Sequence, residues 1–227
     1  MLAKKTTAIL AAGTLAFGLV ACGGSSDSGA ENASGSDGAE IGNVVLANGS
    51  EPQNPLIPGN TNETGGGRIV DEIFAGLVYY DADGEVHNDL AESIELEGDK
   101  TYRVKLKDAK WSDGSPVTAE DYVKAWNYTV ANSLLASYFF EPILGYEEGV
   151  EEMEGLKVED DHTFTIELAQ PEADFPTRLG YSAYFPMHPS AYDDIDAYGE
   201  APISNGPYKL VEWNHNQDAT VVPNDQN

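Results

Sequence analysis

Cys22 is the only cysteine of the 227-residue chain, and the residues before it favour a chemical fate for its thiol. Lys4 and Lys5 precede an apolar run over residues 6–20, and the small residue Ala21 stands directly before the cysteine. This order of a positive segment, an apolar stretch and a small residue is typical of a secretory signal peptide. The run is shorter than the roughly 20 residues that cross a bilayer, so a permanent transmembrane helix is the weaker interpretation.

The residues Leu19-Val20-Ala21-Cys22 resemble the lipobox of bacterial lipoproteins, in which the cysteine is acylated and becomes the mature N-terminus. We therefore predict a lipoprotein signal peptide over residues 1–21 and lipidation of Cys22, which would anchor the chain on the extracytoplasmic face of the cell membrane. The alternative is an incidental thiol, because one cysteine cannot form a disulfide within the chain. Residues 22–40, rich in Gly, Ser, Ala and Asp, are predicted to be a flexible tether.

Other residues that could perform catalysis or hold a metal are scattered. The four histidines are His87, His162, His188 and His215. No two of them stand at metal-ligand spacing, and no Gly-x-Ser-x-Gly segment is present. The acidic pairs at 147–148 and 151–152 could supply a general acid and base, but a solvated surface is the better interpretation in so acidic a chain. The sequence thus predicts a protein that is not an enzyme, without catalytic residues, metal or cofactor.

The charge of the chain limits its partners. Thirty-nine acidic residues against twelve basic ones give −27, and removal of residues 1–21 takes away two lysines and no acid, which leaves −29. Binding to nucleic acid is excluded, because it requires a basic surface. The acidity is expected to favour solubility at a crowded cell surface, and steering of cationic ligands is the alternative use.

The apolar pattern after residue 40 predicts a mixture of strands and helices. Alternation of apolar and polar residues predicts strands, as do shorter β-branched runs. The predicted strands are 43–47, 102–107, 163–168, 208–213 and 219–222. An extended loop is expected over 51–67, including the Gly triplet 65–67, and an apolar stripe predicts a helix over 68–79. The segment 81–84 is predicted to be a turn rather than a calcium loop.

A helix with a defined start is predicted after the turn residues 112–116. Thr118 can cap its first turn, and Asp121 three residues later completes a capping box. Apolar residues at helical spacing, including Trp126 and Val130, should face the core.

Three segments, in this order, resemble the signature phrases of one protein family. They read IFAGLVYYD at 73–81, AKWSDGSPVTAEDYV at 109–123, and SNGPYKL at 204–210 with Trp213 following. Together they are similar to the oligopeptide/dipeptide class, family 5, of substrate-binding proteins that serve ABC importers. The lipobox agrees, because such receptors are tethered lipoproteins in Gram-positive bacteria.

The resemblance implies a mixed α/β fold with two lobes around a hinge and an extra domain inserted in the N-terminal lobe. By similarity, residues 41–74 and 187–227 would form part of the N-terminal lobe, and residues 75–186 the extra domain. The second lobe would be missing, so we expect the chain to be an N-terminal fragment that binds ligand poorly by itself.

The resemblance also implies that the protein captures peptides between its lobes, as a monomer, and delivers them to the permease subunits of an ABC transporter, touching the membrane through its lipid anchor only. The positions that match the family's ligand contacts are Asn62, Glu63, Thr64, Leu135 and Tyr138. One alternative is a receptor of the same fold for a sugar, haem or nickel chelate. Another is a surface-tethered hydrolase.

Overall fold

The computed structural model describes residues 47–227, and its main sheet has four antiparallel strands in the order β3-β4-β6-β5. The strands are β3 (Ala91–Glu97), β4 (Thr101–Leu106), β5 (Leu156–Asp160) and β6 (Thr163–Glu167). The predictions at 102–107 and 163–168 are confirmed, since β4 and β6 are the two central strands. Cys22 and the predicted strand at 43–47 lie outside the described residues, except for Ala47, which is in no strand.

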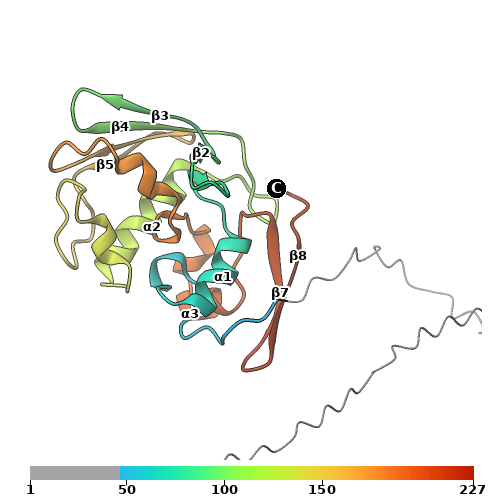
Figure 1. The fold of residues 1–227 in the computed structure, drawn as a ribbon. Helices are drawn as coiled ribbons and strands as arrows, with labels where there is room; N and C mark the ends of the chain where they lie inside the picture. The colour runs from blue at the N-terminus through green and yellow to red at the C-terminus, as the bar shows by residue number, and fades with distance from the viewer. Residues whose placement is uncertain (1–46) are drawn as a thin grey trace, which may run out of the picture. The chain divides into compact units, whose positions relative to one another are not determined.

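One face of the main sheet is covered by α2 (Ala119–Ala131), as Figure 1 shows. The alternating pattern explains this, because it places the apolar residues of β4 and β6 on the same face. Val104 and Phe164 are direct cross-strand partners, and both are fully buried.

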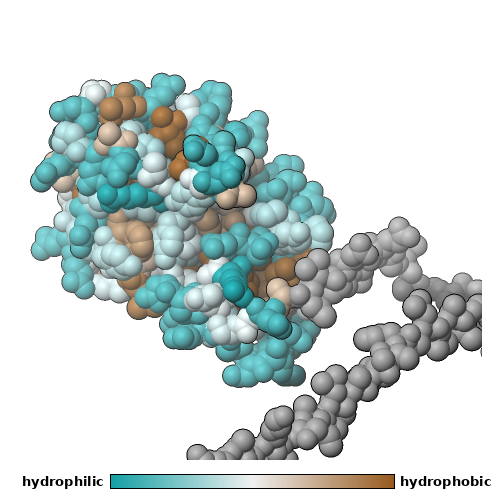
Figure 2. Space-filling view, viewed as in Figure 1, coloured by the Kyte–Doolittle hydropathy of each residue, from teal (hydrophilic) through white to brown (hydrophobic). Residues whose placement is uncertain are grey.

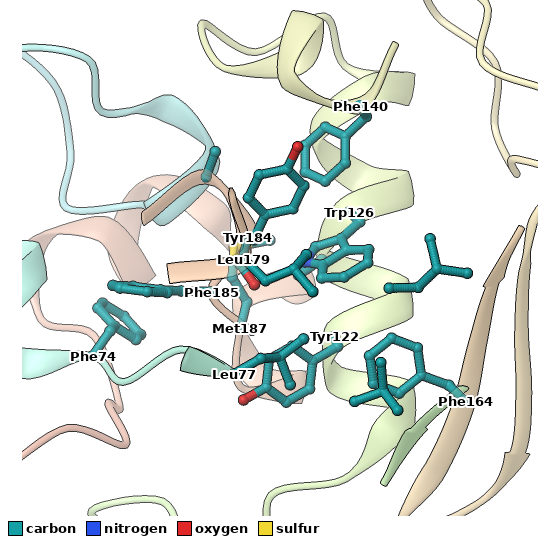
Figure 3. Close-up of a cluster of buried hydrophobic side chains, with 14 of the residues drawn as sticks. Phe74, Leu77, Tyr122, Trp126, Phe140, Phe164, Leu179, Tyr184, Phe185 and Met187 are labelled. Atoms are coloured by element: carbon teal, nitrogen blue, oxygen red, sulfur yellow. The ribbon is translucent and has the colours of Figure 1, made fainter. Parts of the chain in front are cut away.

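Aromatic rings fill the space between α2 and the rest of the core (Figure 3). The Trp126 ring meets Phe164 edge-on with the ring centres 5.7 Å apart, and meets Tyr184 in the same way at 5.5 Å. The indole N–H of Trp126 donates to the Tyr184 carbonyl over 3.0 Å, so this large side chain is buried with its polar atom satisfied.

The start of α2 confirms the predicted capping box at Thr118 and Asp121. The Asp121 carboxylate accepts the backbone N–H of Thr118 over 2.8 Å, and it also accepts the indole N–H of Trp111 over 3.2 Å. Asp121 is buried, and this burial raises the pKa of its carboxyl group.

Two hairpins flank the main sheet. In the first, β1 (Val78–Tyr80) pairs with β2 (Val86–Asn88), and the predicted turn is confirmed because Asp81 accepts the backbone N–H groups of Asp83 and Glu85. The second consists of β7 (Tyr208–Asn214) and β8 (Asp218–Pro223), which confirms the two predicted C-terminal strands. Figure 1 shows this hairpin beside α1 (Thr64–Ile73), and β7 contacts that helix.

The prediction for α1 is wrong in its bounds. The helix covers 64–73, so the Gly triplet lies inside it, while 74–77 is not helical and leads into β1. The helix begins early because Glu63 caps it, and Gly65 fits there because a Cβ atom on it would approach the Ser50 carbonyl oxygen to 2.5 Å.

Short helices complete the fold. They are η1 (Pro58–Asn60), η2 (Ser137–Phe140), η3 (Phe175–Gly180), η4 (Ser182–Tyr184), η5 (Pro189–Tyr192) and α3 (Ile195–Glu200). One buried cluster contains Ile73, Trp126 and Met187, which come from both of the predicted domains, and the boundaries at 75 and 187 stay a prediction. The face drawn in Figure 2 is mainly hydrophilic, with separate hydrophobic patches. Within residues 47–227, no helix is both long and apolar enough to cross a membrane.

Candidate functional site

The second segment predicted to contact ligand is bonded to η1, which ends two residues before Asn62. The backbone N–H of Leu135 donates to the Asn60 side-chain oxygen over 3.3 Å, and the N–H of Ala136 donates to the Gly59 carbonyl over 3.1 Å. The loop after α2 is thereby held against η1 and the residues that follow it. Positions about 75 residues apart in the sequence thus border one surface.

The first predicted segment joins η1 to α1. Asn62 and Thr64 are exposed, and Thr64 is the first residue of the helix. Glu63 is the N-cap, and its carboxylate accepts the backbone N–H groups of Gly65 over 2.6 Å and of Gly66 over 2.8 Å. A carboxylate at this position also complements the positive end of the helix dipole. Glu63 therefore has a structural task, and a contact between this segment and ligand stays a prediction.

The second predicted segment exposes large apolar side chains. Leu135 is 41% exposed and Tyr138 is 53% exposed. The Tyr138 and Phe139 ring centres are 4.5 Å apart, and Phe139 stacks on Tyr181 at the same separation. We call Leu135, Tyr138, Phe139 and Tyr181 the aromatic surface. Sequence reasoning missed Phe139 and Tyr181, although the run SYFF at 137–140 was a signal for the first of them.

Negative charge lies near the aromatic surface. Partial burial, followed by the charges of Tyr138 and Asp71, raises the pKa of Tyr181. A shallow hollow of about 650 Å³ begins at Tyr138 and includes the ion pair between Arg178 and Glu172, whose atoms are 2.9 Å apart. The surface therefore offers flat apolar rings with both signs of charge at its margin, which suits a ligand that is partly apolar and partly charged.

The three signature segments meet at a buried junction. The Asn205 side chain accepts the backbone N–H of Ala75 and donates to its carbonyl, both over 3.1 Å. Next to it, the N–H of Gly206 donates to the Ile73 carbonyl over 2.7 Å. These bonds join the first signature segment to the third.

The middle signature segment is attached to the same junction. The N–H of Ser112 donates to the Ser204 carbonyl over 2.7 Å, and the Ser112 hydroxyl accepts the N–H of Ser204 over 3.3 Å. Hydrogen bonds of Ala75, Ser112 and Asn205 thus hold the three signature segments together, which is a structural task for these residues.

Ser115, His188 and Asp113 come together, and they have the residue types of a catalytic triad. The Ser115 hydroxyl lies 3.2 Å from His188 Nε2 and 2.6 Å from Asp113 Oδ1. The Ser115 hydroxyl donates to this Asp113 oxygen, and His188 Nδ1 lies 2.8 Å from the Ser190 hydroxyl. The Ser115 proton is therefore directed at Asp113 and not at His188, which differs from the arrangement in which a base activates a serine nucleophile. Among residues 47–227, no three or more His, Cys, Asp or Glu side chains gather where they could hold a metal ion.

Known proteins resemble the chain over most of its length. The oligopeptide-binding protein OppA of Bacillus subtilis is 31% identical over 224 residues, which cover 92% of this chain and 40% of that protein. The Escherichia coli protein named "Probable deoxycholate-binding periplasmic protein YgiS" is 33% identical over 184 residues, or 74% of this chain and 34% of that protein. The crystal structure of Haemophilus influenzae OppA in complex with RPPGFSPFR matches with a TM-score of 0.72 and 29% identity, over 78% of this chain and 37% of that one.

The chain therefore spans two fifths or less of the length of these relatives. The mixed α/β fold is confirmed, and it matches part of the family's structure. The family described as bacterial extracellular solute-binding proteins, family 5 Middle, matches residues 85–226, which is more than half of the chain. The chain belongs to the family 5 extracellular solute-binding proteins of bacteria.

Proposed function

We propose that the chain is the peptide-capturing part of a lipid-anchored receptor that delivers its ligand to an ABC transporter permease. The observation that supports the proposal is the bonding of the Leu135 loop to η1, because η1 ends two residues before Asn62. The peptide would lie across Asn62, Thr64, Leu135 and Tyr138. Extended peptides can bind through backbone hydrogen bonds, with their side chains held by apolar and charged margins such as the aromatic surface.

The identities of the relatives support a peptide over other ligands. The B. subtilis relative is named for oligopeptide binding, and the matching H. influenzae structure holds a peptide. The deoxycholate-binding description of the E. coli relative favours a second candidate, a receptor for an amphipathic ligand that is not a peptide. The same rings could pack against such a ligand, so a binding experiment has to include both.

Amide NMR on the full chain tests the ligand surface directly. Peptide is added up to millimolar concentration, so that weak binding is also detected. The expected result is a shift of the amide signals of Asn62, Thr64, Leu135 and Tyr138, reduced in Tyr138→Ala. Tyr208→Ala on β7 is the matched control, since Tyr208 is also an exposed tyrosine. Shifts with deoxycholate and none with peptide would replace the proposal by the second candidate.

The lipid anchor is proposed at Cys22, which lies in the part of the chain that the structure does not describe. Two or more acyl chains would bind a membrane stably, since each buried CH₂ contributes about 0.8 kcal/mol. Metabolic labelling with an alkyne fatty acid should mark the protein in bacteria, and Cys22→Ser should abolish the label. Equal labelling of both proteins would refute the anchor.

A further inference from the structure

His215 lies between two carboxylates that come from distant parts of the chain. It follows β7 at the tip of the second hairpin. Its Nδ1 atom is 3.0 Å from Glu51 Oε1, and its Nε2 atom is 2.7 Å from Glu200 Oε2. Glu51 belongs to the segment that leads into η1, and Glu200 is the last residue of α3. One imidazole ring thus connects three elements.

The hairpin tip is also bonded through its backbone. The N–H of Asn216 donates to the second oxygen of Glu51 over 2.8 Å, so both oxygens of this carboxylate bind the tip. Asn216 has a φ angle of 60°, in the left-handed region that asparagine tolerates better than most residues. The bonds of Glu51 therefore hold the tip where its backbone is tightly turned.

The arrangement is matched to the protonated form of His215. An ionised carboxylate is only an acceptor, and neutral imidazole has one donor nitrogen, whereas protonated imidazole has two. A neutral ring would direct a lone pair at either Glu51 or Glu200. The hydrogen bonds with Glu200 and then Glu51 accordingly raise the pKa of His215 above its usual 6.5.

The other groups around His215 do not compete for its protons. The Trp213 ring packs beside it, with the ring centres 4.2 Å apart. On the other side of the tip, the Asp218 carboxylate accepts from the Asn214 side chain over 3.0 Å. Glu51 and Glu200 are thus the charged groups that face the ring from the elements packed against the tip.

We propose that Glu51, His215 and Glu200 form a proton-dependent clasp, which fastens the tip of the β7–β8 hairpin to the entry segment and to α3 and loosens as the pH rises. The clasp is independent of the proposed function.

The direction of the pH effect follows from the raised pKa. A group that binds its proton more tightly in the folded state contributes fully below its unfolded pKa of about 6.5. This contribution is lost as the pH rises through the higher folded pKa. The clasp is therefore closed in weak acid, and it opens as the pH rises through the raised pKa of His215.

The test is hydrogen exchange of the Asn216 amide in the full chain, expressed as protection relative to an unstructured peptide at each pH. We expect protection to fall about two- to fivefold between pH 6 and pH 9, the size that an exposed ion pair typically contributes. In His215→Gln the protection should be low and independent of pH, while His162→Gln, which changes an exposed histidine 3.7 Å from a single carboxylate, should behave like the wild type.

An NMR titration of the His215 ring provides the second measurement. The expected pKa is above 6.5, and it should fall in both Glu51→Gln and Glu200→Gln. A pKa at or below 6.5, or the same pH dependence of Asn216 exchange in His215→Gln as in the wild type, would overturn the clasp. Neither measurement uses a ligand, so failure of the clasp is distinguishable from failure of the proposed function.

Discussion

Replacement of Asn205 by alanine should destabilise the fold strongly, because the Asn205 side chain is the buried partner of the Ala75 backbone. Asn205 is 1% exposed and Ala75 is 6% exposed, and the two hydrogen bonds between them are both 3.1 Å long. Alanine would leave a buried N–H and a buried C=O without partners. Each unsatisfied group costs about 1–3 kcal/mol. We expect a loss of about 3 kcal/mol, since water entering the vacated space would satisfy part of this demand.

A loss of this size is easily measured. It is a large part of the roughly 5–15 kcal/mol that stabilises a typical protein. For a domain of this size it corresponds to a decrease in Tm of about 6–12 °C. Urea unfolding can be followed by tryptophan fluorescence, because Trp111 and Trp126 are both fully buried.

The matched control is Asn132→Ala, which removes an exposed asparagine whose side chain donates to the Tyr128 carbonyl at the end of α2. This change should cost well under half as much as Asn205→Ala. Equal losses in the two variants, or a loss below about 1 kcal/mol in Asn205→Ala, would refute this reasoning. Asn205 would then not stabilise the fold by bonding the buried backbone groups of Ala75.

Substitutions at Glu63 and at Gly206, each with a control, test two other features of the fold. Glu63→Ala should lower the free energy of unfolding by about 1 kcal/mol through loss of the N-cap of α1, whereas Glu63→Gln keeps an acceptor oxygen and should lose less; urea unfolding followed by circular dichroism compares them. Gly206→Ala should lose about 1–3 kcal/mol, because its Cβ atom would lie 2.6 Å from the Ile73 carbonyl carbon. Gly67→Ala is the control in thermal unfolding, since its Cβ atom would meet nothing within 4 Å inside a helix, and it should raise Tm. A lower Tm in Gly67→Ala than in Gly206→Ala would contradict this reasoning.

The parts of the fold that the sequence predicts well are those whose signal is local. Alternation along 102–107 and 163–168 is sufficient for two central strands, because side chains on a strand point to opposite faces in turn. The capping box at Thr118 and Asp121 is equally local, since its two members stand three residues apart. The acidic pairs at 147–148 and 151–152 are exposed, as expected of a solvated surface.

The start of α1 could not be predicted because its cause lies elsewhere in the chain. Three consecutive glycines normally indicate a loop. Here Gly65 lies against the backbone of Ser50, a contact that single-sequence patterns do not encode, and Glu63 supplies the cap that begins the helix. The helix ends at Ile73 rather than continuing because Ala75 is bonded to Asn205, a partner 130 positions away.

The aromatic surface of the candidate site could likewise be predicted only in part from the sequence. The resemblance predicts Leu135 and Tyr138; both are exposed, and the Leu135 backbone is bonded to Asn60 of η1. Tyr181 reaches the same surface from a segment more than 40 residues later, by stacking on Phe139. No local pattern places these rings together, because their contact depends on how η2 and the segment before η4 pack.

The junction and the aromatic surface consist of different residues, so membership of the family does not determine which ligand the chain binds. The Asn205 side chain satisfies the backbone of Ala75, and Ser112 and Ser204 bond each other, so these residue types serve hydrogen bonding within the fold, whatever the ligand. A peptide receptor and a receptor for an amphipathic solute can therefore share them. Under the proposed function, selectivity would rest on exposed side chains such as Leu135 and Tyr138, which make none of the hydrogen bonds of the junction. Changes at this surface should alter which ligand binds, while the free energy of unfolding stays nearly constant. Changes at the junction should lower the free energy of unfolding and leave the choice of ligand unaltered.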